Sequence, residues 1–243
     1  MTNAVTIVLV ATVFSVAAAM HSLTGFGFSL ISVGILSLVI GPRLAVPLVV
    51  IASTTNCIYL MWLLRRDIMF KEVIALVVIC ALFTPVGSIC LRHFNKTVIM
   101  RSMGLVILVV SFMSLLQLQH LKLFAARPFK WLAAAIAGLL GGAFDMPGPP
   151  LVLYAYNCDW PVRNAMANLQ FVFAVLSPVI IISFGFSGLL NRAVVGWGIA
   201  YTPLVCLFTV IGSRISRRLS IRNLNVVINV FLVLLAISLV VKG

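Results

Sequence analysis

The sequence predicts an all-α protein that crosses a membrane many times, built from two inverted-topology repeats. Of its 243 residues, 63% are hydrophobic and only 9% are charged, and the mean hydropathy is +1.23. Apolar runs close to the ~20 residues that span a bilayer recur along the chain. Two of the apolar regions are interrupted at matching places. Each half is therefore predicted to hold one broken-helix hairpin and three transmembrane helices.

The apolar segments, in order, define the predicted helices. They run at about 3–20, 27–40, 45–64, 73–91, 102–119, 131–144, 149–158, 164–184, 193–213 and 223–241. Several segments beside the interruptions are too short to cross ~30 Å of hydrocarbon at ~1.5 Å per residue. We therefore expect a hairpin at about 3–40 and another at about 131–158, each entering and returning on one side. The division is an N-terminal repeat (1–119), a basic linker (120–130) and a C-terminal repeat (131–243).

The second interruption, Gly138–Tyr154, is the most informative stretch of the chain. It holds four glycines, three prolines and one carboxylate, Asp145. Proline removes a backbone donor and disturbs a continuous helix. Unpaired backbone groups at membrane depth must be buried in protein or line a wet cavity. A shorter counterpart occurs at His21–Phe28. Both are interpreted as helix breaks whose loose ends form a binding site, as in many secondary transporters.

An internal repeat supports this layout. Gly41-Pro42-Arg43-Leu44-Ala45 aligns with Trp160-Pro161-Val162-Arg163-Asn164-Ala165, and Gly87-Ser88 aligns with Gly212-Ser213. Each half then reads as a hairpin followed by three crossings. An odd number of crossings gives the two halves opposite orientations, which is an inverted-topology repeat. A duplicated scaffold that does not transport remains the alternative.

The net charge of +13 comes from 17 Lys and Arg against 4 Asp and Glu. In a membrane protein this indicates basic loops that follow the positive-inside rule, and a basic interior would also attract anions. If both hairpins return, most basic residues gather on one side. This predicts a multi-pass protein of the cell inner membrane with both termini extracytoplasmic. The five cysteines are interpreted as small buried side chains, with no disulfide set.

Several motifs together resemble the TauE/SafE sulfite-exporter family over nearly the whole chain. In the first half these are Thr24-Gly25-Phe26-Gly27, Gly41–Val46, Arg65–Ile68 and Pro85–Ser88; in the second they are Gly141–Pro150, Arg163–Ala165 and Gly212-Ser213. The resemblance implies a multi-helix carrier for sulfur-containing or other small organic anions, such as sulfite or sulfonates.

The helix breaks are the expected substrate site. A helix that restarts inside a membrane has free N–H groups with partial positive charge, which suit an anion. Glycine lets an anion approach the backbone, and proline suits a first turn. A packing kink is the alternative. Polar residues on the following helices, such as Ser53 and Ser177, are further candidates. The expected substrate-binding residues are Thr24, Gly25, Gly27, Asn56, Asp145, Gly148, Pro149, Asn168 and Gln170.

For four charged or titratable residues, the sequence leaves more than one role open. Asp145 is expected to cap the restarting helix, to be a proton or cation coupling site, or to pair with an arginine. His21 is either hydrogen-bonded structure or a proton-coupling residue. Arg43 and Arg163 each begin a helix after a hairpin. They either extend to the lipid head groups or attract and gate anions.

The predicted function is secondary transport of a small anion, sulfite or an organosulfonate, by alternating access with the substrate held between the two hairpins. The alternatives are a membrane-embedded enzyme that uses His21 and Asp145, an anion channel, and a structural subunit. Enzyme motifs such as H-E-x-x-H, G-x-S-x-G and the P-loop do not occur, so no enzyme activity is expected. Neither a cofactor nor a metal ion is expected. The expected partners are a small anion and the lipid bilayer, without nucleic acid, and the sequence leaves a homodimer open.

Overall fold

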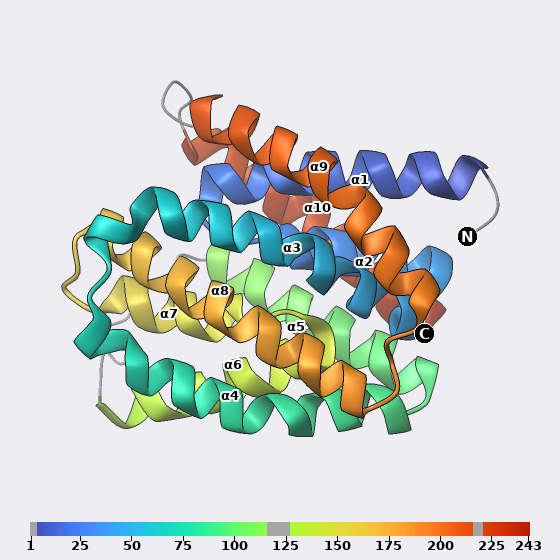
Figure 1. Cartoon of the computed structure of the whole chain (residues 1–243), viewed down its shortest axis with the longest axis horizontal. Coiled ribbons are helices and arrows are strands. Elements are labelled where there is room, and N and C mark those ends of the chain that lie inside the picture. Colours follow the sequence, from blue (N-terminus) through green and yellow to red (C-terminus); the bar gives the residue numbers. More distant parts are fainter. Residues whose placement is uncertain (1–3, 116–126, 216–220) are drawn as a thin grey trace.

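The computed structural model describes residues 4–115, 127–215 and 221–243, and the regular elements in these ranges are all helical. The chain is folded as one helical bundle (Figure 1). The helices are α1 (Ala4–Thr24), α2 (Phe28–Ile40), α3 (Pro42–Leu64), η1 (Arg65–Asp67), α4 (Phe70–His93), α5 (Lys96–Leu115), α6 (Arg127–Phe144), α7 (Gly148–Asn157), α8 (Val162–Phe186), α9 (Arg192–Ile215) and α10 (Ile221–Lys242).

Six of the described helices are long and apolar enough to cross a membrane: α1, α3 together with η1, α4, α5, α8 and α9. In contrast, α2 has 13 residues and α7 has 10. At ~1.5 Å per residue, neither of these two can span the hydrocarbon alone. The protein is therefore an all-α, multi-pass membrane protein, as the sequence predicts.

Both hairpins form, but their first arms are longer than half-helices. Helix α1 has 21 residues and α6 has 18, whereas the returning arms are the short α2 and α7. The first break is reduced to residues 25–27, so His21 and Thr24 lie in the last turn of α1 instead of within the break. The second break is similarly short, at residues 145–147.

The described part of the predicted basic linker, residues 127–130, is helical. Residues 120–126 of the predicted basic linker lie outside the described residues, as do 116–119 at the end of the N-terminal repeat. Residues 127–130 form the first turn of α6, so the second hairpin begins before residue 131. Lys130 forms an ion pair with Glu72 of α4 at 3.6 Å. Packing against α4 therefore extends the helix into the polar segment.

The two hairpins enter the bundle from opposite ends. Helix α2 ends at the glycine before α3, and α3 ends at η1. At η1, Asp67 accepts a bond from Arg163 Nε at 2.7 Å, and its carbonyl accepts one from Asn164 at 2.9 Å. The second hairpin, which ends just before these residues of α8, therefore returns at the far end of α3. The first arm α1 begins at the same end of the molecule at which α10 ends (Figure 1).

Each hairpin packs its first arm against a long helix from the other half. Helix α6 runs along α4, and α1 runs along α9. The approach is close because small residues lie at the contact. A side-chain carbon at Gly87 or Gly142 would overlap the backbone of the facing helix, and one at Gly212 would lie 2.8 Å from the carbonyl oxygen of Ala19. Helices α3 and α8 pack against each other and are the most buried of the six spanning helices.

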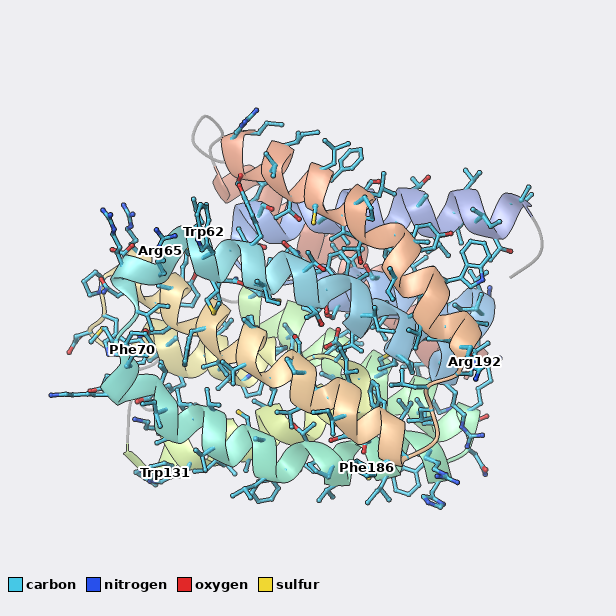
Figure 2. All side chains as sticks on the ribbon, viewed as in Figure 1. Trp62, Arg65, Phe70, Trp131, Phe186 and Arg192 are labelled. Carbon is cyan, nitrogen blue, oxygen red and sulfur yellow. The ribbon has the colours of Figure 1, made fainter. Side chains whose placement is uncertain are left out.

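Charged and aromatic side chains mark the two ends of the bundle. Figure 2 shows Trp62, Arg65 and Trp131 at one end and Arg192 at the other. The guanidinium of Arg65 lies 4.7 Å from the centre of the Trp62 ring. Exposed apolar side chains such as Leu82 cover the outer faces between these ends. This distribution is typical of a membrane protein whose apolar outer surface faces lipid between two polar ends.

We predict that Gly142→Ala lowers the melting temperature of the purified protein, because the added carbon would collide with the Thr84 carbonyl. The expected loss is about 1–3 kcal/mol, as for other overpacked sites. The measurement is thermal unfolding in detergent. Gly196→Ala is the matched control: nothing lies within 4 Å of its added carbon, and alanine gains up to ~1 kcal/mol of helix propensity there. Equal melting temperatures for the two variants would contradict the packing described.

Candidate functional site

The two helix breaks meet at one internal cavity of about 40 Å³. The first break contributes Phe26–Leu30 and the second contributes Asp145–Pro149. The remaining wall comes from His21 of α1, from Ser53 and Cys57 of α3, and from Phe173, Ser177 and Ile180 of α8. Residues more than 100 positions apart in the chain therefore face one small space.

Left-handed backbone conformations make both turns possible. Gly25 and Gly27 have φ values of +79° and +106°, and Asp145 has a φ of +54°. Most side chains disfavour this region, but glycine adopts it freely and aspartate tolerates it. The N–H of Gly25 bonds to His21 O at 2.7 Å, and that of Asp145 bonds to Gly141 O at 2.8 Å. These bonds satisfy the ends of α1 and α6 before the chain reverses.

The two returning helices present different numbers of donors to the cavity. In α2, the helical hydrogen bonds begin with the one from Ile31 N to Gly27 O at 3.1 Å, so the three preceding N–H groups have no carbonyl within the helix. In α7, the first residue is Gly148 and the next two are prolines, which have no N–H. Helix α2 therefore offers several free N–H groups, as expected for a helix that restarts. Among the first three residues of α7, only Gly148 has an N–H group.

Asp145 connects the second break to the other half of the protein. Its side chain is 4% exposed. Its Oδ2 accepts hydrogen bonds from Ser29 Oγ at 2.7 Å and from Ser53 Oγ at 3.2 Å. Ser29 lies in the first turn of α2, and Ser53 lies on α3. The carboxylate therefore sits at the start of α2, where the helix dipole favours negative charge.

Two of the three roles considered for Asp145 are not supported by these contacts. The ion pairs among the described residues are Lys130–Glu72 and Arg163–Asp67, so Asp145 has no arginine partner there. Its recorded bonds lead to α2 and α3, so it does not cap α7, the helix that follows it. A buried carboxylate without a cation is costly unless its charge is neutralised in another way. The coupling role of Asp145 stays a prediction.

His21 takes part in a short chain of hydrogen bonds beside the first break. Gln170 of α8 donates from Nε2 to the Gly25 carbonyl at 2.6 Å. Its Oε1 lies 3.3 Å from Nε2 of His21. The other ring nitrogen, Nδ1, is buried and has no hydrogen-bond partner. The ring is 4% exposed and forms part of the cavity wall.

The nine expected substrate-binding residues divide into two groups. Gly27, Asp145, Gly148 and Pro149 line the cavity. Thr24, Gly25, Asn56, Asn168 and Gln170 do not, although Gly25 and Gln170 hold the His21 side of it. The two asparagines join helices: Asn56 Oδ1 accepts from Thr209 Oγ1 at 3.0 Å, and Asn168 Oδ1 accepts from the Met69 N–H at 2.8 Å.

Arg43 and Arg163 lie at opposite ends of the bundle and away from the cavity. Arg43 Nη2 donates to the carbonyl oxygens of Arg92 and Phe94, at 2.7 and 3.0 Å. Arg163 is paired with Asp67. Both arginines therefore hold helix ends together. Their role in attracting anions stays a prediction.

Ser29 is a polar wall residue that the sequence does not predict. A signal was present, because Ser29 follows Gly27 by two residues and so falls in the first turn of the restarted helix. A second regularity appears only in the structure. The repeat alignment pairs Arg43 with Arg163, and at the same offset Ser53 and Cys57 correspond to Phe173 and Ser177, all of which line the cavity.

A comparison with models of known protein families shows to which family the chain belongs. A family model described as "Sulfite exporter TauE/SafE" matches residues 9–239. The chain belongs to the TauE/SafE family. The matched range includes the second hairpin, the first hairpin from residue 9 onward and every residue of the cavity wall, and it confirms the resemblance found in the motifs. TauE/SafE proteins are a transporter family. No curated protein and no solved structure matches the chain significantly.

We predict that Ser29→Ala destabilises this TauE/SafE protein by about 1–3 kcal/mol, because it leaves the buried Asp145 carboxylate with one donor fewer. Thermal unfolding in detergent measures the effect. Ser102→Ala is the control, because that hydroxyl bonds only to carbonyls of its own helix. The Ser29 substitution should cost less in an Asp145→Ala background, since contacting residues are energetically coupled. If the losses of stability from Ser29→Ala and Asp145→Ala are strictly additive in the double variant, the Ser29–Asp145 hydrogen bond contributes nothing to stability.

Proposed function

We propose that this protein is a secondary transporter that carries a small anion, sulfite or a small organosulfonate, in the cavity between the two helix breaks. One observation carries the proposal: hairpins that enter from opposite ends of the bundle place their breaks against the same 40 Å³ space. Irregular backbone at membrane depth is characteristic of transporter binding sites, where it lines a cavity. The TauE/SafE family match supports transport as the activity.

The size of the cavity favours a substrate with few atoms. One water molecule needs roughly 10–15 Å³ measured in this way, so about 40 Å³ accommodates a solute of a few heavy atoms. Sulfite and methanesulfonate are in this range. A longer sulfonate requires the hairpins to separate. The free N–H groups at the start of α2 supply the donors that an oxyanion needs.

Alternating access follows from the inverted repeat that we propose for residues 1–119 and 131–243. Helix α1 packs along α9 of the other half, and α6 packs along α4, which corresponds to α9 in the repeat. Gly212 meets Ala19 in one pair, and Gly87 meets Leu139 in the other. Rocking one half against the other would then open the cavity to each side in turn.

The orientation that we propose places the η1 end in the cytoplasm. Arg65, Arg66, Lys71, Lys130 and Arg163 lie on or beside the segments at that end. The positive-inside rule favours the cytoplasmic side for such a cluster. Both termini are then extracytoplasmic, in the inner membrane.

We predict that the protein in proteoliposomes catalyses saturable uptake of radiolabelled sulfite or methanesulfonate, and that Asp145→Asn lowers the rate at least about tenfold, equivalent to ~1.4 kcal/mol. Asp67→Asn is the matched control, because Asp67 is at η1, outside the cavity wall. Non-saturating conductance would indicate a channel instead. Absence of flux for sulfite, sulfonates and carboxylates would contradict transport.

Cys57 provides a native probe for alternating access. It is 5% exposed and lies on the cavity wall. With Cys80, Cys90, Cys158 and Cys206 replaced by serine, we predict slow labelling of Cys57 by a small methanethiosulfonate reagent, because the residue is buried and must become accessible first. Saturating methanesulfonate, which does not react with the reagent, should slow this labelling further, and mass spectrometry of the intact protein measures it. A rate that does not respond to any transported anion would contradict substrate binding in the cavity.

A further inference from the structure

We propose that the cavity binds its anion together with one proton, and that the side chain of Asp145 carries that proton. The proposal rests on the transport function above and names what is bound with the substrate. It follows from the position of Asp145, from the absence of a balancing cation on the cavity wall, and from the hydrogen bonds already made by the wall residues.

Asp145 occupies the place that suits an anion best. Its Oδ2 accepts the hydroxyl of Ser29, in the first turn of α2. The free N–H groups and the dipole of that helix end favour a single negative charge. An ionised Asp145 and an anionic substrate would therefore occupy the same small space with like charges. Only one of the two, the carboxylate or the substrate, can carry a negative charge in this space at a time.

The wall contains no cation to balance a second negative charge. Its residues include no lysine or arginine. The other titratable groups on the wall are His21 of α1 and the Cys57 thiol of α3. A thiol adds no positive charge. Neutralising the carboxyl group with a proton is the simplest way for an anion to enter.

The side-chain hydroxyl donors of the wall are already committed. Ser29 and Ser53 donate to Asp145, although Ser53 can instead reach Val50 O at 3.1 Å, and Ser177 donates to Phe173 O at 2.8 Å. Acceptors are left over. Oδ2 of Asp145 receives both hydroxyl bonds, and none is recorded to Oδ1 among the described residues.

His21 adds a second acceptor to the same wall. The Gly25 carbonyl fixes the orientation of the Gln170 amide, so Gln170 Oε1 faces His21 and requires a hydrogen on Nε2. In the neutral ring, Nδ1 then holds a lone pair, and it is buried without a partner. Side chains that offer acceptors and few free donors do not suit a bare anion. They do suit an anion that arrives with a proton.

The step is a simple proton transfer. A hydronium ion from the solution on the entry side gives its proton to Asp145 at Oδ1 and leaves neutral water, while the two serine hydroxyls remain on Oδ2. The neutral carboxyl group then donates its O–H to an oxygen of the anion, whose other oxygens face the N–H groups of α2. Release reverses these bonds, and the proton leaves with the anion. One singly charged anion and one proton therefore cross together.

The test uses radiolabelled methanesulfonate and the full-length protein in proteoliposomes, with the membrane potential clamped. Methanesulfonate stays ionised across the working pH range, so a proton that moves with it must be carried by the protein. With equal anion concentrations on both sides, an inside-alkaline pH gradient should drive accumulation of the label, about tenfold per pH unit at one proton per anion. A sodium gradient should have no effect.

Variants of Asp145 test whether this residue carries the proton. Asp145→Glu should retain accumulation driven by the pH gradient, whereas Asp145→Asn should lose it. Asp67→Asn, at η1, should behave as the parent protein. Accumulation in Asp145→Asn equal to that of the parent, or accumulation driven by sodium instead, would overturn the proposal. Downhill flux without any response to the pH gradient would overturn it while leaving the transport function intact. Absence of downhill flux for methanesulfonate, sulfite and carboxylates alike would overturn both.

Binding gives an independent measurement that needs no vesicles. Methanesulfonate should raise the melting temperature of the detergent-solubilised protein by mass action. Above the pH at which Asp145 ionises, its apparent affinity should fall up to about tenfold per pH unit, because one proton is taken up on binding. Asp145→Asn should remove this slope. A parent protein whose affinity is independent of pH would contradict the coupling, even if methanesulfonate binds tightly.

Discussion

The structure depends on one constraint: backbone groups freed by a helix break inside a bilayer must meet polar partners or a cavity. The chain satisfies this constraint by bringing both helix breaks to the same cavity. Asp145, in the second break, accepts hydroxyl groups from Ser29 beside the first break and from Ser53 on α3. The same contacts that satisfy the polar groups also bring the two halves together at the site. In the proposed transport function, Asp145 therefore links the stability of the fold to anion binding.

The close approach of the hairpins to their neighbours makes this arrangement possible. Gly142 and Gly87 remove side-chain bulk where α6 runs along α4, and Gly212 does so where α9 meets α1. Because lipid provides little hydrophobic force between helices, dense packing of small residues supplies the association. The first arms are thereby held against the opposite halves, so a change in the angle between the halves would move both breaks at once. This mechanical link is what an alternating-access transporter requires.

The general fold could be predicted because its signals are local. Composition, apolar periodicity and the glycine- and proline-rich interruptions identify a multi-pass helical protein with two broken hairpins, and the ordered motifs identify the TauE/SafE family. The site was predicted in part. Gly27, Asp145, Gly148 and Pro149 line the cavity because breaks must face a polar space. Asn56, Asn168 and Gln170 are predicted from polarity alone. The two asparagines bond to other segments of the bundle outside the cavity wall, and Gln170 bonds to the first break.

The sequence by itself determined where helices stop and restart, because proline and glycine act on the backbone within one or two turns. Only the tertiary structure decided which side chains meet. Ser29 and Asp145 are 116 residues apart, and their contact depends on how α2, α3 and α6 pack. The same holds for Arg43 and Arg163, whose partners are backbone and acidic groups at helix ends. Helix packing sums many weak contacts over the whole bundle, and no local pattern in the chain encodes that sum.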